Sequence, residues 1–136
     1  MAGYSNTATW KKLGIKEGTR VIALHAPENY TQILGELPPG AVLERRLYKS
    51  ASFIHYFARD KSALARDFPK LKRALLASGT LWISWPKAAS KVPTDLNDQV
   101  VREIGLKNGL VDVKVAALDE VWSGLKFVYR LKDRKK

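Results

Sequence analysis

Cysteine is absent from this sequence, and histidine and glycine-rich loops are scarce. Without thiols the chain forms no disulfide and offers no thiolate nucleophile or metal ligand. The only histidines, His25 and His55, do not form a paired metal-binding pattern, so we expect no metal and no cofactor. A Gly-x-Ser-x-Gly motif and a phosphate-binding Walker loop are also missing, which disfavours serine hydrolase and P-loop chemistry.

Long hydrophobic runs are missing too. No apolar stretch approaches the roughly 18 residues that a membrane-spanning helix needs. Residues 1–16 lack the apolar core of a secretory signal peptide. The sequence therefore predicts a cytoplasmic protein without a membrane partner.

Acidic residues are half as frequent as basic ones: 13 Asp and Glu stand against 24 Lys and Arg, for a formal net charge of +11. Such a balance favours anionic partners, either nucleic acid or a small phosphorylated ligand. Part of the charge lies in Arg130–Lys136 (RLKDRKK), which reads either as a solubilising tail or as a nucleic-acid contact. The remaining basic residues are dispersed over several predicted elements, for example at Lys11, Lys12, Arg45, Arg46, Lys70, Lys72 and Arg73.

The chain has 136 residues, of which 46% are hydrophobic, so it is long and apolar enough for one domain with a real core. We expect an N-terminal helical arm (1–19), an α/β domain (20–131) and a basic tail (132–136). Apolar patterning predicts strands at 20–26, 41–48, 52–58, 80–85, 112–118 and 125–131. Helices are predicted at 7–13, at 28–34, between Asp60 and Gly79, and from Thr94 or Asp95 to Gly105 or Gly109.

The order of these elements indicates the topology. Alternating strands and helices predict a parallel sheet with right-handed crossovers and flanking helices. The last two strands are too close in sequence for a crossover, so they must form an antiparallel hairpin. The fold class is therefore α/β: a single domain with a mostly parallel sheet that ends in one antiparallel hairpin.

Several segments resemble known families. The helix, glycine turn and strand of Leu71–Trp85 (LKRALLASGTLWISW) resemble the methyltransferase-like Rossmann fold, in a reduced form that spans Arg20–Leu131. The chain also resembles a family of small bacterial proteins known only as a domain of unknown function, which implies a fold but no activity. The segments that carry this second resemblance are GYSNT (3–7), KLGIKEG (12–18), WPKAASKVPTDL (85–96) and VDVKVAALDEVWSGLKFV (111–128).

The chain departs from the methyltransferase pattern where the cofactor binds. Methyltransferases place glycines after the first strand so that the backbone approaches S-adenosylmethionine. Here the loop reads LHAPENY (24–30), without glycine. The predicted second strand ends at Leu47-Tyr48-Lys49, without the acidic residue that would hold the ribose, and Ala58–Lys61 lacks an Asn-Pro-Pro-Tyr motif. We therefore expect no S-adenosylmethionine binding and assign no catalytic residue.

Ligands of open α/β sheets bind beyond the carboxyl ends of the strands. Four candidate residues lie at the carboxyl ends of predicted strands, just beyond them or in the final hairpin turn: His25, Arg59, Trp85 and Trp122. Four more precede or begin the last helix, whose N-terminus favours an anion: Lys87, Ser90, Lys91 and Thr94. If the final strand inserts next to the fourth, we expect Lys87, Ser90, Lys91, Thr94 and Trp122 to line one shallow anion pocket.

Other interpretations of these residues remain open. Trp85 and Trp122 also read as core residues that close the end of the sheet, and His55 reads as a hydrogen-bonded core histidine. Three functions compete. The first is a non-catalytic domain that binds a small anionic ligand or a protein partner at the strand ends. The second is a weak, non-specific RNA- or DNA-binding module that uses the dispersed Lys and Arg residues and the basic tail. The third is an enzyme, which would require His25, Arg59 and Asp60 to converge in a cleft.

Overall fold

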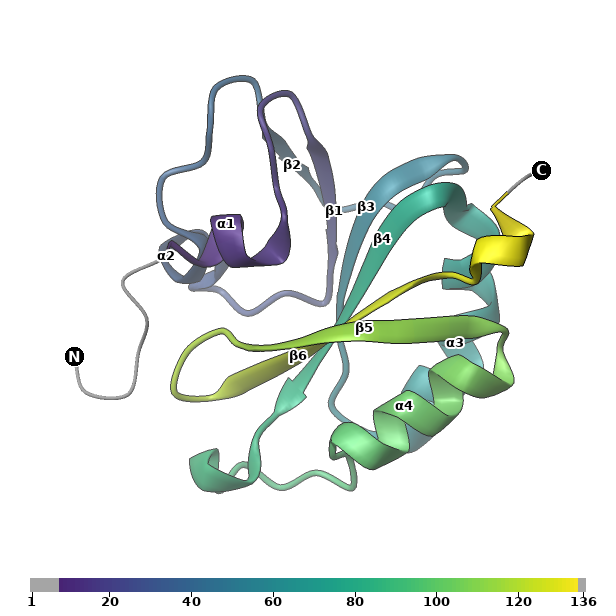
Figure 1. Ribbon diagram of the computed structural model, residues 1–136. Coiled ribbons are helices and arrows are strands. Elements are labelled where there is room, and N and C mark those ends of the chain that lie inside the picture. Colours follow the sequence, from purple (N-terminus) through teal and green to yellow (C-terminus); the bar gives the residue numbers. More distant parts are fainter. Residues whose placement is uncertain (1–7, 135–136) are drawn as a thin grey trace.

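The computed structural model describes residues 8–134 and contains a six-stranded sheet in the order β2-β1-β3-β4-β6-β5 (Figure 1). β1, β2, β3 and β4 are parallel, whereas β6 is antiparallel to both of its neighbours. The predicted fold class is confirmed, including the hairpin and the insertion of the last strand beside the fourth. The strands are β1 (Arg20–Leu24), β2 (Val42–Glu44), β3 (Ala51–Phe57), β4 (Leu75–Pro86), β5 (Leu110–Ala117) and β6 (Trp122–Tyr129).

Helices cover both faces of the sheet, with α3 and α4 on one face and α1 and α2 on the other (Figure 1). The α-helices are α1 (Thr9–Leu13), α2 (Tyr30–Leu34), α3 (Lys61–Ala74) and α4 (Asp98–Lys107). Two short 3-10 turns, η1 (Ala88–Ser90) and η2 (Leu131–Asp133), follow β4 and β6. No helix of residues 8–134 has both the length and the apolar composition needed to cross a bilayer.

Each face has its own core because successive residues of a strand point to opposite sides. On the first face Leu64, Phe68 and Leu71 of α3 are fully buried against the sheet, as their helical spacing predicts. On the second face Trp82 is fully buried, and its indole N–H donates to the carbonyl of Leu13 at 2.9 Å. This bond ties the end of α1 to the centre of the sheet.

Two boundaries differ from the predictions in the middle of the chain. The helix expected to run to Gly79 ends at Ala74, because Leu75 already pairs with Ala51 of β3. Gly79 lies inside β4, where a Cβ would be 2.8 Å from Leu75 Cδ1 and 3.1 Å from the carbonyl oxygen of Ala51. The glycine therefore permits close packing and does not end the helix.

The start and end of α4 also differ from the sequence reading. The helix begins at Asp98, and the N-cap is Asn97, whose side chain accepts from the amide of Val100 at 2.8 Å. The prediction that the helix starts at Thr94 or Asp95 is therefore wrong. Gly105 lies within the helix, so of the two predicted stops only Gly109, with φ +89°, follows the helix end.

The second strand is shorter than predicted and ends at Glu44. Residues 47–49 therefore do not stand at its carboxyl end, and an acidic residue does. At the ends of the chain, Thr7, the segment GYSNT and the last two residues of the predicted basic tail lie outside the described residues.

Candidate functional site

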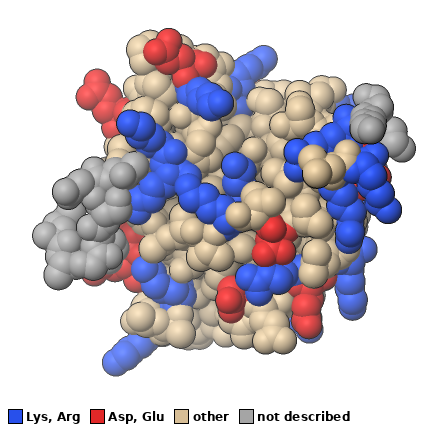
Figure 2. All heavy atoms as spheres, viewed as in Figure 1, with Lys and Arg blue, Asp and Glu red and all other residues tan. Residues whose placement is uncertain are grey.

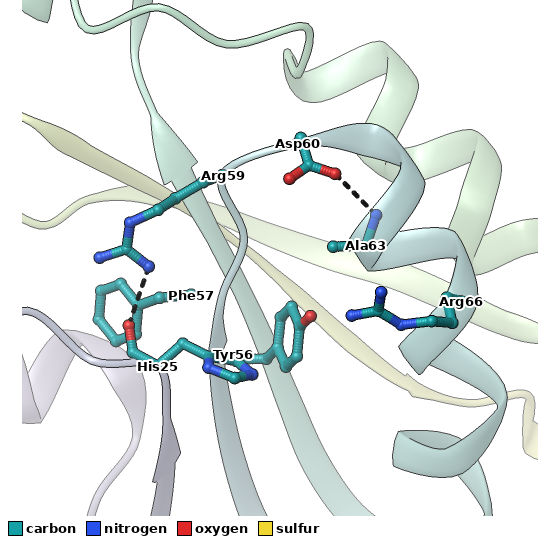
Figure 3. A pocket seen from close by; sticks show the side chains of 7 residues that line it. All are labelled: His25, Tyr56, Phe57, Arg59, Asp60, Ala63 and Arg66. Atoms are coloured by element: carbon teal, nitrogen blue, oxygen red, sulfur yellow. Dashed lines mark hydrogen bonds between the residues drawn. The ribbon is translucent and has the colours of Figure 1, made fainter.

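A pocket of about 170 Å³ opens at the carboxyl ends of β1 and β3 (Figure 3). Because β2 and β4 lie on opposite sides of these strands, the pocket is at the point where the strand order reverses. Open α/β sheets bind their ligands at such points. The lining residues come from the end of β1, the end of β3 and the start of α3: His25, Tyr56, Phe57, Arg59, Asp60, Ala63 and Arg66.

Arg59 is an exposed cation with a fixed position in this pocket. Its Nη1 donates to the main-chain oxygen of His25 at 3.2 Å, and its guanidinium carbon lies 5.2 Å from the centroid of the Trp122 ring. Among residues 8–134 no carboxylate forms an ion pair with Arg59. A guanidinium has five N–H donors, so most of those of Arg59 remain free for an anion.

The loop before α4 holds Arg59 in place. The hydroxyl of Thr94 donates to the main-chain oxygen of Arg59 at 2.7 Å, and the carboxylate of Asp95 accepts from the amide of Lys61 at 2.7 Å. The Asp60 carboxylate accepts from the amide of Ala63 at 2.8 Å. Two carboxylates thus occupy the N-terminus of α3, so an anion in the pocket depends on the arginine side chains.

A second arginine reaches the pocket from α3 (Figure 3). Arg66 donates to both carboxylate oxygens of Asp67, at 3.1 and 3.4 Å, and Tyr56 donates to the same carboxylate at 2.5 Å. Hydrogen bonds from Arg66 and Tyr56 hold the pKa of Asp67 below its ordinary value, although burial acts in the opposite direction. Burial, followed by the contact with Asp67, raises the pKa of Tyr56. Arg66 is therefore neutralised locally, and Arg59 is the freer of the two.

His25 has a left-handed backbone conformation, with φ +59°. Residues other than glycine rarely adopt it, and such strained positions cluster at functional sites. The imidazole packs edge-on against Tyr56, with ring centroids 5.2 Å apart. The conformation directs the main-chain oxygen of His25 toward Arg59 (Figure 3).

His55 belongs to a hydrogen-bond network in the core behind the pocket. Its Nδ1 is 2.8 Å from the hydroxyl of Tyr30, and its Nε2 is 2.7 Å from the hydroxyl of Ser84. All three side chains are buried, and burial lowers the pKa of His55 to about 3. The prediction of a hydrogen-bonded core histidine is confirmed.

The structure separates the candidate residues into two groups. His25 and Arg59 line the pocket, and Trp122 and Thr94 support Arg59 from outside it. Lys87, Ser90 and Lys91 belong to the turn after β4, where the Ser90 hydroxyl donates to the Lys87 carbonyl at 2.7 Å. None of these three is among the residues that line the described pocket.

The pocket described above is not the one predicted for Lys87, Ser90, Lys91, Thr94 and Trp122, since none of these five residues lines it. Trp122 is only 6% exposed and packs edge-on against Phe57, with centroids 4.9 Å apart. Trp85 is only 5% exposed, so the alternative reading of both tryptophans as core residues fits their burial. They do lie at one end of the sheet, as expected, because Trp122 pairs with Pro86.

Sequence reasoning missed Tyr56 and Arg66. Tyr56 lies in an apolar strand, and no local pattern marks it as a pocket residue, although it is next to the strand end. Arg66 had a usable signal: Asp60, Ala63 and Arg66 recur every three residues, which places them on one side of the first helical turns. Within residues 8–134, no three His, Asp or Glu side chains gather closely enough to hold a metal ion.

The solved structures that resemble this fold include three methyltransferases. A TehB-like SAM-dependent methyltransferase from Corynebacterium glutamicum aligns with TM-score 0.56 and 10% identity over 95% of this chain and 91% of its own. A SAM-dependent methyltransferase from Aquifex aeolicus aligns with TM-score 0.56 and 16% identity over 86% and 85%. Magnesium protoporphyrin IX methyltransferase from Synechocystis, with bound SAH, aligns with TM-score 0.55 and 10% identity over 88% and 78%.

These likenesses establish the fold as methyltransferase-like and Rossmann-type. At such low identity they carry no activity over to this chain. No protein-family model matches the sequence, and no curated protein matches it.

Proposed function

We propose that this methyltransferase-like domain binds a small anionic ligand, such as a phosphate or carboxylate compound, in the pocket at the ends of β1 and β3. The observation that carries the proposal is the environment of Arg59. Its guanidinium faces the pocket without a carboxylate partner among the described residues, and Thr94, Trp122 and the His25 carbonyl fix its position. A fixed guanidinium binds the oxygens of an anion at a low cost in conformational entropy.

S-adenosylmethionine, which the fold family implies, does not fit these residues. The pocket of about 170 Å³ is smaller than the roughly 300 Å³ at which pockets for drug-sized ligands begin. The loop after β1, LHAPENY (24–30), contains none of the glycines that let a backbone approach this cofactor. Glu44 ends β2, but one oxygen of its carboxylate, Oε2, already accepts from Arg20 at 2.6 Å. We therefore derive no methyl-transfer step.

We extend the proposal to the family of small bacterial proteins that the sequence resembles. Two of its segments, 85–96 and 111–128, contain Thr94 and Trp122, which both contact Arg59. We propose that members of that family share this anion pocket, in a bacterial and cytoplasmic setting.

A catalytic role is the second candidate, and one observation favours it. His25, Arg59 and Asp60 line the same pocket, which is the convergence that an enzyme would need. Against it, one oxygen of Asp60 already caps α3. Binding without catalysis therefore has the better support.

Thermal unfolding in the presence of inorganic phosphate, citrate and AMP tests the proposal. A ligand at 100 times its Kd adds about 2.7 kcal/mol to the free energy of unfolding, so at least one of these probes should raise the Tm of the wild type. R59Q should abolish the rise. R73Q is the matched control, because Arg73 is an exposed arginine near the other end of α3. Equal responses of the wild type and R59Q, or none in the wild type, would overturn the proposal.

A further inference from the structure

A second cationic feature lies on the other side of the sheet, where the end of α1 meets β5 and β6. It consists of four lysines, which we call the lysine cluster: Lys12, Lys16, Lys114 and Lys126. Figure 2 shows the Lys and Arg atoms of this region as a band across the surface between α1 and β5. The cluster is separate from the pocket at the ends of β1 and β3, whose lining contains none of the four.

The contacts within the cluster bring these side chains close together. Lys114 and Lys126 stand directly opposite each other on β5 and β6. The Lys114 ammonium donates to the carbonyl of Lys12 at 2.9 Å, and the Lys12 ammonium donates to the carbonyl of Ala117 at 3.4 Å. Burial, followed by the nearby charges of Lys114 and Lys16, lowers the pKa of Lys126.

In the part of the chain that the structure describes, no carboxylate forms an ion pair with these four lysines. The ion pairs among residues 8–134 involve other basic groups, on Arg20, Arg66, Lys70 and Arg102. Glu17 follows Lys16 in the sequence but forms no ion pair with the cluster. Like charges directly opposite each other destabilise a sheet. The arrangement therefore costs stability, and an external anion would offset that cost.

We propose that the lysine cluster binds the phosphate backbone of a nucleic acid. The four lysines come from α1, the loop that follows it, β5 and β6, and the basic side chains of this region form a band (Figure 2), so a chain of phosphates matches them better than a single small anion. Lysine contacts of this kind position the backbone without reading bases. The binding is therefore salt-dependent and not sequence-specific.

A membrane surface fits the cluster less well. Membrane-bound surfaces combine basic residues with large apolar side chains on the same face. Two exposed apolar side chains flank Lys114: Val115 points to the opposite face, because adjacent strand residues alternate, whereas Val113 lies in the bulge between Asp112 and Lys114. Both are valines, and not the Trp, Phe or Leu side chains that anchor a protein surface in a membrane.

The test is fluorescence anisotropy with a short labelled single-stranded RNA and a labelled duplex DNA, in a series of salt concentrations. K16Q/K114Q/K126Q should weaken binding at low salt by about tenfold or more. It should also reduce the salt slope on the single strand by about two, since each phosphate contact contributes about 0.7. The matched control is K49Q/K61Q/K107Q, which removes the same charge from exposed positions elsewhere and should change affinity about twofold or less.

Other variants separate the sources of binding. R59Q should bind nucleic acid like the wild type, so failure of the anion pocket and failure of the lysine cluster give different results. Deleting residues 131–136 should leave most of the affinity in place. Equal losses in the two lysine triples, loss only on removal of the tail, or binding to phosphatidylserine vesicles but not to nucleic acid would each overturn the proposal.

The stability of the variants is measured separately, as the Tm of thermal unfolding. Removing mutually repelling lysines should leave the Tm unchanged or raise it. If the cluster triple loses stability, the single variant K126Q in the same anisotropy series replaces it. The proposal then requires the salt slope to fall for K126Q and not for K107Q.

Discussion

The guanidinium of Arg59 lies over the indole of Trp122, with its central carbon 5.2 Å from the ring centroid. A cation over an aromatic face gains about 0.5 to 1 kcal/mol at exposed sites. The ring fixes the position of the guanidinium but takes up none of its N–H donors. A buried tryptophan at the start of β6 thereby supports a cation that belongs to the loop after β3.

The first prediction concerns Thr94, which we regard as a positioning residue. T94V removes the hydrogen bond to the carbonyl of Arg59 and the one that its hydroxyl accepts from the amide of Leu96. Urea unfolding should show a loss of about 1 to 2 kcal/mol. The affinity for the anionic probe that stabilises the wild type should fall as well, and T94S should restore it. Normal binding by T94V would show that Arg59 does not depend on this contact.

The second prediction concerns acid and His55. Its pKa in the folded protein, about 3, lies below the value of about 6.5 expected for the unfolded chain. Between these values the unfolded chain binds more protons, so stability falls as the pH falls. The contribution of His55 is about 1.4 kcal/mol per pH unit in this range. Urea unfolding at a series of pH values measures the slope.

Two variants show whether His55 causes this dependence of stability on pH. H25Q removes an exposed histidine and should keep the slope, whereas H55Q should lose it. If H55Q does not fold, NMR titration of the wild-type imidazole decides the matter. A His55 signal that titrates near pH 6.5 in the folded protein contradicts the prediction.

The third prediction is that G105A destabilises the protein, which is the opposite of the usual effect of this change inside a helix. Replacing glycine by alanine inside a helix normally stabilises it by about 0.5 to 1 kcal/mol. Here the new Cβ would overlap the ring of Phe127, 2.7 Å from Cδ1. G105A should therefore destabilise the protein by about 1 to 3 kcal/mol. In an F127L background the same change should cost less, and a stabilised G105A single variant would contradict the packing.

The fourth prediction is that S-adenosylmethionine leaves the Tm unchanged at millimolar concentration, because the loop at His25 lacks glycine and Glu44 is bound to Arg20. The anionic probe that stabilises the wild type serves as the positive control. A rise in Tm that grows with the cofactor concentration would show that the loop accommodates it after all.

The sequence by itself determined the fold class. Apolar runs separated by glycine and proline established the strands, helical spacing established the buried side of α3, and the short last connection required an antiparallel hairpin. His55 stands between apolar residues in the sequence, and this identified it as a core residue. These features are local, so patterns within a few residues are enough to predict them.

Only the tertiary structure decided the candidate site. The side chains of Thr94 and Asp95 are good helix caps by composition, yet they bond to Arg59 and Lys61 because the fold brings the two loops together. Glu44 stands at the end of β2, where a ribose ligand would be expected, and only the structure shows that it pairs with Arg20. The opposition of Lys114 and Lys126 depends on strand register. Such contacts join segments far apart in the chain, and no local pattern specifies which of several available partners a polar group takes.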